Sequence, residues 1–122
     1  MQTKKTLVLG ASPKPDRYAY KAIHALRGQK YPVVAVGYRK AQVADVDIDT
    51  EFPTRGDDIH TVTMYLGVRN QEDYIESILN LQTQRVIFNP VSENPRFANQ
   101  LTNQGVEVLN ACTLVMLSVG SY

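Results

Sequence analysis

The architecture of this chain is set by residues 5–12, which read KTLVLGAS. The run Lys5–Leu9 has no polar alternation, and such a run is typical of a strand that is covered on both faces. A loop with two prolines follows, after which Asp16 is placed to cap a helix from about Arg17 to Leu26. A buried strand followed by an amphipathic helix is typical of a parallel α/β sheet.

The same alternation continues along the chain. Further strands are expected at residues 32–36, 61–66, 86–88 and 106–109. We expect Asn70 to cap the next helix, and Asn94 with Pro95 to open the one after, with Gly105 just beyond its end. A last short helix is expected from about Cys112.

Residues 45–51 alternate acidic residues with Val46 and Ile48, which indicates a solvated segment at the edge of the sheet.

Strands that alternate with amphipathic helices, and are themselves almost uniformly apolar, form a parallel sheet with helices on both faces. The sequence therefore predicts an α/β fold, as a single doubly wound, Rossmann-like domain over residues 1–122 with a five-stranded parallel sheet.

The composition excludes several classes of protein. The chain has 122 residues and a net charge of +1, without a block of one sign, so it has no electrostatic footprint for nucleic acid. No apolar run approaches the roughly 20 residues that span a bilayer. The single cysteine, Cys112, excludes an internal disulfide and suits a reducing compartment. We therefore expect a cytoplasmic, soluble protein that binds neither nucleic acid nor membrane.

In a doubly wound sheet, ligands bind outside the carboxyl ends of the strands, so the residues that follow each strand are the candidates for a site. After the first strand, Gly10, Ala11 and Ser12 let a backbone approach a phosphate closely, and Arg17 adds a charged fork. After the second strand, the basic residues Arg39–Lys40 stand where a phosphate on an adenosine ribose would lie. The alternative is a plain strand-to-helix turn with solvated basic residues.

Three common motifs of this fold are missing. The acidic pair of a phosphoacceptor domain, the phosphate loop G-x-x-x-x-G-K-[ST] and the dinucleotide fingerprint G-x-G-x-x-G do not occur. A standard NAD site is further disfavoured because basic residues, rather than an acidic one, follow the second strand. No cluster has metal-ligand spacing, and neither histidine, His24 or His60, has a visible catalytic partner.

Residues 8–17, VLGASPKPDR, resemble the first-loop signature of the small stand-alone CoA-binding proteins. The fold of that family is similar to the nucleotide-binding domain at the start of the succinyl-CoA synthetase α subunit. Residues 36–40 and 110–112 stand where the family has its CoA-contacting loop and its cysteine. Gly37-Tyr38 departs from a loop that often carries proline, and Asn89-Pro90 stands where many relatives have tryptophan and glutamine.

The resemblance implies that coenzyme A is the ligand and that the loops after the strands contact it. The implied contacts are Gly10, Ala11, Ser12 and Arg17 on the pyrophosphate, Tyr38, Arg39 and Lys40 in the loop near the ribose and its 3′-phosphate, Tyr65 and Leu66 beside the adenosine, Asn89 and Pro90 along the pantetheine arm, and Cys112 near the thiol.

We therefore expect a protein that binds CoA or acyl-CoA, as an accessory or sensing module without catalysis of its own. A homodimer is one form in which we expect it. One alternative is an NADP-type oxidoreductase, and another is a scaffold whose nucleotide site is vestigial. Two roles stay open for Cys112. It is either a small buried hydrophobe or a thiolate that forms a mixed disulfide with CoA.

Overall fold

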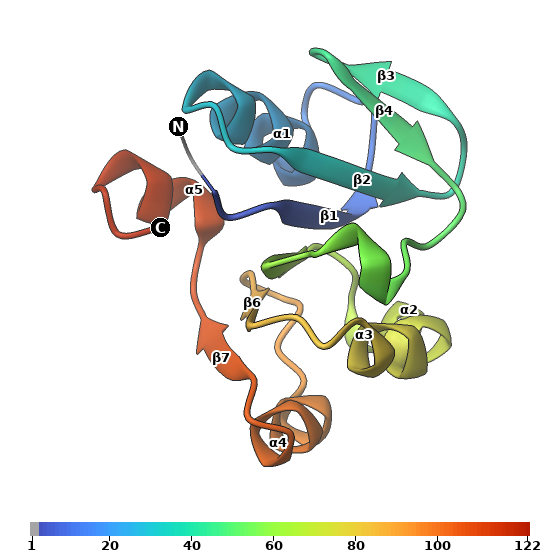
Figure 1. Ribbon diagram of the computed structural model, residues 1–122. Coiled ribbons are helices and arrows are strands. Elements are labelled where there is room, and N and C mark those ends of the chain that lie inside the picture. The colour runs from blue at the N-terminus through green and yellow to red at the C-terminus, as the bar shows by residue number, and fades with distance from the viewer. Residues whose placement is uncertain (1–2) are drawn as a thin grey trace.

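The computed structural model describes residues 3–122 and has one sheet with helices on both faces (Figure 1). The strands are β1 (Thr6–Ala11), β2 (Val33–Gly37), β3 (Ala41–Val43), β4 (Val46–Asp49), β5 (Thr61–Met64), β6 (Arg85–Phe88) and β7 (Glu107–Asn110). The helices are α1 (Tyr18–Gly28), α2 (Val68–Gln71), α3 (Ile75–Leu81), α4 (Pro95–Asn103) and α5 (Thr113–Ser118), with short 3₁₀ turns at Arg55–Asp57 and Glu72–Tyr74.

The strand order is β3-β4-β2-β1-β5-β6-β7, and the neighbours from β4 to β7 all pair in parallel. The winding reverses at β1, because β2 and β5 pair with its two sides. Thr6 of β1 is in register with Val33 on one side and with Thr61 on the other. The predicted doubly wound α/β fold is confirmed, and the reversal places a site at the carboxyl end of β1.

Two apolar cores lie on opposite faces of the sheet. Leu7 and Leu9 of β1 face the core that contains Phe97 of α4, whereas Val8 faces the core that contains Ile23 of α1 and Met116 of α5. Successive side chains of a strand point to opposite faces, so an uninterrupted apolar run fills both cores. This is the physical reason for the uninterrupted apolar run at residues 7–9.

The expected five-stranded parallel sheet is wrong in one respect, because the sheet has seven strands. The additional strands, β3 and β4, form an antiparallel hairpin, and β4 also pairs in parallel with β2. The alternation within residues 45–51 is that of a half-buried strand, with Val46 and Ile48 inward and Asp47 exposed. The edge itself is β3, which has three residues and was too short to predict from its pattern.

Two of the expected helix caps are wrong. The chain makes a turn before α1, in which the Arg17 N–H donates to the Lys14 carbonyl, and Arg17 rather than Asp16 is the N-cap residue. Asn70 lies inside α2, which begins after Gly67. The expected cap Asn94 is confirmed, because its Oδ1 accepts a hydrogen bond of 3.1 Å from the Phe97 N–H.

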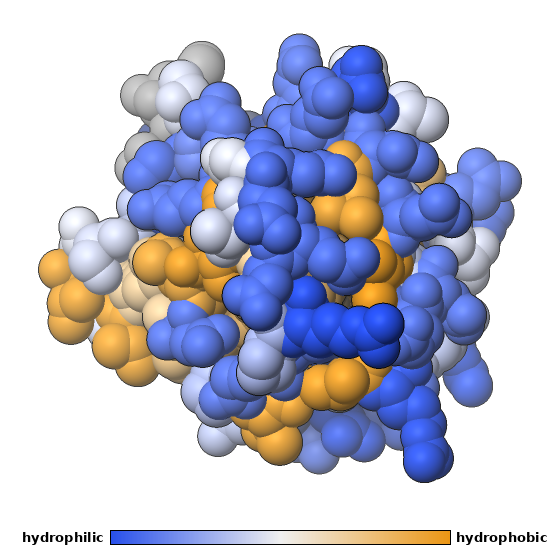
Figure 2. All heavy atoms as spheres, turned by 90° about the horizontal axis from the view of Figure 1, so that it is seen from below, coloured by the Kyte–Doolittle hydropathy of each residue, from blue (hydrophilic) through white to orange (hydrophobic). Residues whose placement is uncertain are grey.

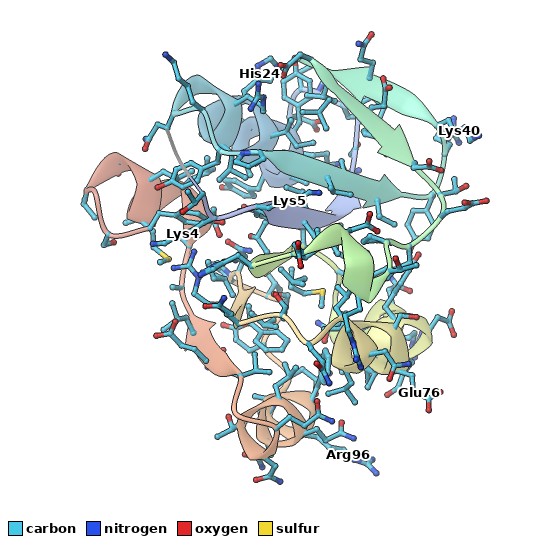
Figure 3. The ribbon with its side chains drawn as sticks, in the orientation of Figure 1. Lys4, Lys5, His24, Lys40, Glu76 and Arg96 are labelled. Carbon is cyan, nitrogen blue, oxygen red and sulfur yellow. The ribbon has the colours of Figure 1, made fainter. Side chains whose placement is uncertain are left out.

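Tyr122 packs against the residues around the start of β1, at the amino end of the sheet, where it forms hydrogen bonds with Lys4 and Thr6. Lys4, which precedes β1, lies at this end in Figure 3. The buried ring of Tyr122 contacts the guanidinium of Arg85 at 4.4 Å and the ring of Tyr31 at 4.9 Å. Within residues 3–122, none of the helices combines the length and apolar character needed to cross a bilayer.

Candidate ligand-binding site

A cleft of about 600 Å³ opens at the carboxyl ends of β1, β5 and β6. Its walls are the loop after β1, the first residues of α1, and the loops that follow β5 and β6. Eight residues expected from the sequence line it: Gly10, Ala11, Ser12, Arg17, Tyr38, Tyr65, Leu66 and Pro90. Six further residues complete the lining: Tyr18, Ala19, Gly67, Asn70, Val91 and Ser92.

A second, more enclosed chamber of about 350 Å³ adjoins this cleft. Tyr18, Tyr65, Pro90 and Val91 line both spaces, so the two adjoin. The remaining lining residues of the chamber are Asn89, Cys112 and Leu114. The site therefore has a part of mixed polar and apolar lining beside the first loop and a largely apolar part beside Cys112.

Two other hollows lie away from the carboxyl ends of the strands. One, of about 690 Å³, is lined by residues before β6 and β7, including Thr83 and Gly105, at the amino end of the sheet. The other, of about 330 Å³, lies between the 72–76 segment and α4. Because ligands of doubly wound sheets bind at the carboxyl ends, we take the cleft and chamber as the candidate site.

Gly10 allows the loops after β1 and β5 to approach each other. It has φ +91°, in the left-handed region that favours glycine, and an added Cβ would lie 3.1 Å from Leu66 Cδ2. Ser12 Oγ accepts a hydrogen bond of 3.2 Å from the Lys14 N–H, which leaves the Ser12 hydroxyl proton free to donate. A ligand in the cleft can therefore approach the backbone of the first loop closely and accept a hydrogen bond from the Ser12 hydroxyl.

The charged residues of the region are exposed and unpaired. Within residues 3–122 the only ion pair joins Arg27 to Asp45 at 2.8 Å, so Arg17 on the cleft wall has no carboxylate partner. Asp16, although it is an anion next to Arg17, does not line the cleft. The mouth of the cleft beside the first loop is therefore cationic.

The loop after β2 contributes an aromatic ring to the cleft. Tyr38 lines the cleft and is 73% exposed. Arg39 and Lys40 are exposed and are not part of the lining. Figure 3 shows Lys40 extending away from the sheet. The structure thus brings Tyr38 to the site and leaves the two basic side chains outside its wall.

Asn89 serves the fold as well as the chamber. Its Nδ2 donates to Thr63 Oγ1 at 2.8 Å and to the Met64 carbonyl at 3.0 Å, and its Oδ1 accepts from the Thr113 N–H at 2.9 Å. Thr63 and Thr113 also share a hydrogen bond of 2.8 Å between their hydroxyls. The amide thus ties β5, β6 and the start of α5 together, and both of its polar atoms already have partners.

A second buried amide holds the two loops that face each other across the cleft. Gln71 Nε2 donates to the carbonyls of Leu66 at 2.8 Å and Ser92 at 2.7 Å, and its Oε1 accepts from Asn94 Nδ2 at 2.9 Å. Sequence reasoning missed Gln71, because a glutamine on a helix is usually solvated and no local pattern marks it as buried.

Tyr65 carries a buried hydroxyl with no hydrogen-bond partner among residues 3–122. Burial raises the pKa of the Tyr65 phenol to about 12, so the group stays protonated at neutral pH. A protonated phenol can donate a hydrogen bond. Tyr65 therefore lines the cleft and the chamber, whereas its hydroxyl oxygen is buried near the hydroxyls of Thr63 and Thr113.

The loop after β6 contains a strained residue. The Ser92 N–H donates to the Asn89 carbonyl at 2.9 Å, with Pro90 second in the turn and Val91 third, at φ +75°. This is the pattern of a type II turn, whose third position normally holds glycine or asparagine. A β-branched residue there is unusual, and Val91 is 89% exposed on the wall of the cleft. Strain of this kind gathers at ligand-binding sites.

Neither histidine lies at the candidate site. His24 is exposed on α1 beside the ring of Tyr20. His60 precedes β5 at the amino end of the sheet, where its Nδ1 lies 2.7 Å from Thr61 Oγ1. Among residues 3–122 no group of three or more His, Cys, Asp or Glu side chains is arranged to hold a metal ion.

The reversal of the winding at β1 and the cleft at the strand ends define a Rossmann-like protein with a nucleotide-type binding site. The chain belongs to the family of CoA binding domains, whose family model matches residues 4–118. None of the curated proteins matches the chain.

Solved structures show the same fold. The chain is similar to an uncharacterized protein of known crystal structure, with 39% sequence identity, full coverage of both chains and a TM-score of 0.92. A hypothetical protein from Pyrococcus horikoshii OT3 is 22% identical, with 95% of this chain and 82% of that chain covered and a TM-score of 0.85. A Thermus thermophilus protein is 22% identical, with 98% and 90% covered and a TM-score of 0.79. The last two show the fold alone.

Proposed function

We propose that this protein binds coenzyme A or an acyl-CoA in the cleft and chamber, as an accessory or sensing module without catalysis of its own. Membership of the CoA binding family supports this proposal. The observation that carries it is the division of the site into a cleft of mixed polar and apolar lining, with Arg17 at its mouth, and an adjoining apolar chamber. CoA has the matching division, because a phosphorylated nucleotide and an arm with polar groups lead to an uncharged end, which is the thiol or the acyl group that it carries.

In this proposal the pyrophosphate binds beside the first loop. Gly10 and Ala11 allow the phosphate to approach the backbone, and Ser12 Oγ donates to it. The first N–H groups of α1 have no partner within the helix and favour an anion at that point. Arg17 supplies the charge, and Tyr65 and Leu66 lie beside the adenosine.

The pantetheine arm then passes Pro90 and Val91, which line both spaces, and directs the thiol toward Cys112. We propose that Arg39 and Lys40, which are flexible basic side chains just outside the wall, reach the 3′-phosphate of the bound ligand. Tyr38, in the same loop, lies against the ribose. A mixed disulfide between CoA and Cys112 stays a prediction.

The proposal also includes the cellular compartment and the oligomeric state of the protein. The single cysteine favours a reducing compartment such as the cytoplasm. The likeness to the nucleotide-binding domain of succinyl-CoA synthetase and the formation of a homodimer remain predictions. Size-exclusion chromatography with light scattering would test the latter.

A thermal-shift series with CoA, dephospho-CoA, ADP and NADP tests the proposal. A ligand that binds only the folded state stabilises it by about 2.7 kcal/mol at a concentration of 100 Kd. We expect the largest shift with CoA, and a smaller shift with dephospho-CoA. The double variant R39S/K40S should remove the difference between these two ligands, and Arg17→Ala should weaken both.

The alternatives give different results in the same series. A larger shift with NADP than with CoA would favour an NADP-type oxidoreductase. The absence of a shift with every ligand at millimolar concentration would leave a scaffold with a vestigial site. Either result would overturn the proposal.

A further inference from the structure

The chamber beside Cys112 contains little that a polar ligand group could bind. No charged side chain is among its lining residues, and most of its surface is apolar. Most ligand pockets combine an apolar lining with a few polar groups that fix the orientation of the ligand. Here the candidates for such groups are Asn89, Tyr65 and Cys112.

These three groups have limited use for a ligand. The Asn89 amide donates to Thr63 and Met64 and accepts from Thr113, so its polar atoms are already committed. The thiol of Cys112 is a weak donor and a weak acceptor. The Tyr65 hydroxyl oxygen is itself buried, near the hydroxyls of Thr63 and Thr113, and is not exposed to the chamber.

The pantetheine arm of CoA does not match such a chamber along its whole length. It carries two amides and a hydroxyl, and each of these polar groups costs free energy when it is buried without a hydrogen bond. The cleft of about 600 Å³ offers backbone groups, Ser12 and Asn70, and is more open to water. The arm therefore fits the cleft, and the chamber suits a group that is apolar.

We infer that the chamber holds the acyl group of an acyl-CoA, so that the protein prefers thioesters of short, uncharged acyl groups to free CoA. This inference rests on the proposed function and identifies the class of its ligand. The volume of about 350 Å³ is about ten times that of a water molecule in the liquid, which leaves room for several methylene groups.

The same chamber discriminates against acyl groups that carry a second carboxylate. A carboxylate placed among Pro90, Val91 and Leu114 would lose its hydration without gaining a cationic partner. We therefore expect a dicarboxylic thioester such as succinyl-CoA to bind more weakly than a monocarboxylic thioester of the same chain length.

Calorimetry with CoA, acetyl-CoA, butyryl-CoA and succinyl-CoA on the full chain tests the inference. Burial of each methylene group contributes about 0.8 kcal/mol, so affinity should rise about fourfold per added methylene from acetyl-CoA to butyryl-CoA. Succinyl-CoA should bind about tenfold more weakly than butyryl-CoA, because its second carboxylate would be desolvated.

Substitutions by phenylalanine at two neighbouring positions of α5 test whether the chamber causes the preference for acyl-CoA over CoA. Leu114 lines the chamber, whereas Val115 is 57% exposed on the outer side of the helix. The outer surface of α5 belongs to the hydrophobic area at the left edge of Figure 2. Leu114→Phe should reduce the ratio of the butyryl-CoA affinity to the CoA affinity to near one. Val115→Phe should keep the wild-type ratio.

A second substitution at Leu114 tests the inference if the Leu114→Phe protein does not fold. Leu114→Ala enlarges the chamber and should shift the preferred acyl chain to a greater length. Equal affinities for CoA and butyryl-CoA in the wild-type protein, or tighter binding of succinyl-CoA, would overturn the inference and leave CoA binding intact. No heat of binding with CoA itself would instead overturn the proposed function.

Discussion

The Cα of Gly37 lies so close to the backbone of Ala11 that a Cβ added to Gly37 would be 2.4 Å from the Ala11 carbonyl oxygen. Gly37 ends β2 and Ala11 ends β1, and the two residues are paired where the winding of the sheet reverses. The close approach brings the loop that carries Tyr38 next to the first loop. A glycine at the end of β2 therefore helps to form the wall of the cleft.

Substitution of Gly37 by alanine should force these two strands apart. We expect Gly37→Ala to lower the free energy of unfolding by about 2 kcal/mol, as overpacking of a core does, and to weaken CoA binding. Urea denaturation measures the first effect. Gly28→Ala is the matched control, because nothing lies within 4 Å of its added Cβ, and it should raise stability by about 0.5 kcal/mol. Equal effects of the two substitutions would refute the steric argument.

Replacement of Val91 should relieve the strain of the turn after β6. A left-handed conformation costs a β-branched residue about 1–2 kcal/mol, and glycine adopts it freely. Val91→Gly should therefore raise the unfolding free energy by about 0.5–1 kcal/mol while it lowers ligand affinity, because an apolar wall is removed. Val119→Gly is the control. Val119 is also exposed but has φ −102°, which valine adopts without strain. The substitution Val119→Gly should therefore lower the unfolding free energy.

Loss of the Gln71 side chain should leave three polar groups of the cleft loops without a partner. These are the carbonyls of Leu66 and Ser92 and the Asn94 Nδ2 group. We expect Gln71→Leu to lower the unfolding free energy by about 3 kcal/mol, since each buried unsatisfied group costs about 1–3 kcal/mol. Asn70→Ala, at the exposed neighbouring position, should change stability by less than about 0.5 kcal/mol. A small effect of Gln71→Leu in denaturant titrations would contradict the assigned network.

Stability should decrease in mildly acidic solution because of His60. Burial lowers the pKa of His60, with further contributions from Arg85 and Lys4, while Glu107 acts in the opposite direction. The unfolded chain therefore takes up a proton at this residue before the folded chain does. The corresponding stability is present above about pH 6.5 and is lost as the pH falls through the folded-state pKa.

The variant His60→Gln should flatten this part of the pH profile. Denaturation midpoints measured from pH 5 to pH 7.5 should fall less steeply toward acid for the variant than for the wild type. Above pH 7 the two proteins should show parallel profiles. An unchanged acid slope in His60→Gln would show that another group is responsible.

Local patterns in the sequence were sufficient to predict the parallel core and the first loop, which lines the cleft. Residues 7–9 fill both cores because they are apolar at every position, and Asn94 and Pro95 begin a helix by chemistry that operates within four residues. The loop at Gly10–Ser12 follows directly from the end of the first strand. Such features depend on near neighbours along the chain, and periodicity and capping report them.

Other features were beyond the reach of local patterns, because they depend on segments that are distant in the chain. The three-residue strand β3 exists because β4 pairs with it, and its own sequence has no strand signal of useful length. Asn89 was expected at the ligand, yet its amide joins three elements of the fold. Which polar group is committed to the fold and which remains free is settled only by packing.

The sequence by itself determined that a buried strand, a glycine-containing loop and a helix would follow one another at the carboxyl end of a parallel strand. Only the tertiary structure decided that the candidate site has two adjoining parts, because Tyr18 and Val91 come together from elements 73 positions apart in the numbering. A strand's apolar pattern constrains its burial but not its partners. The shape of a cavity depends on where those partners place their side chains.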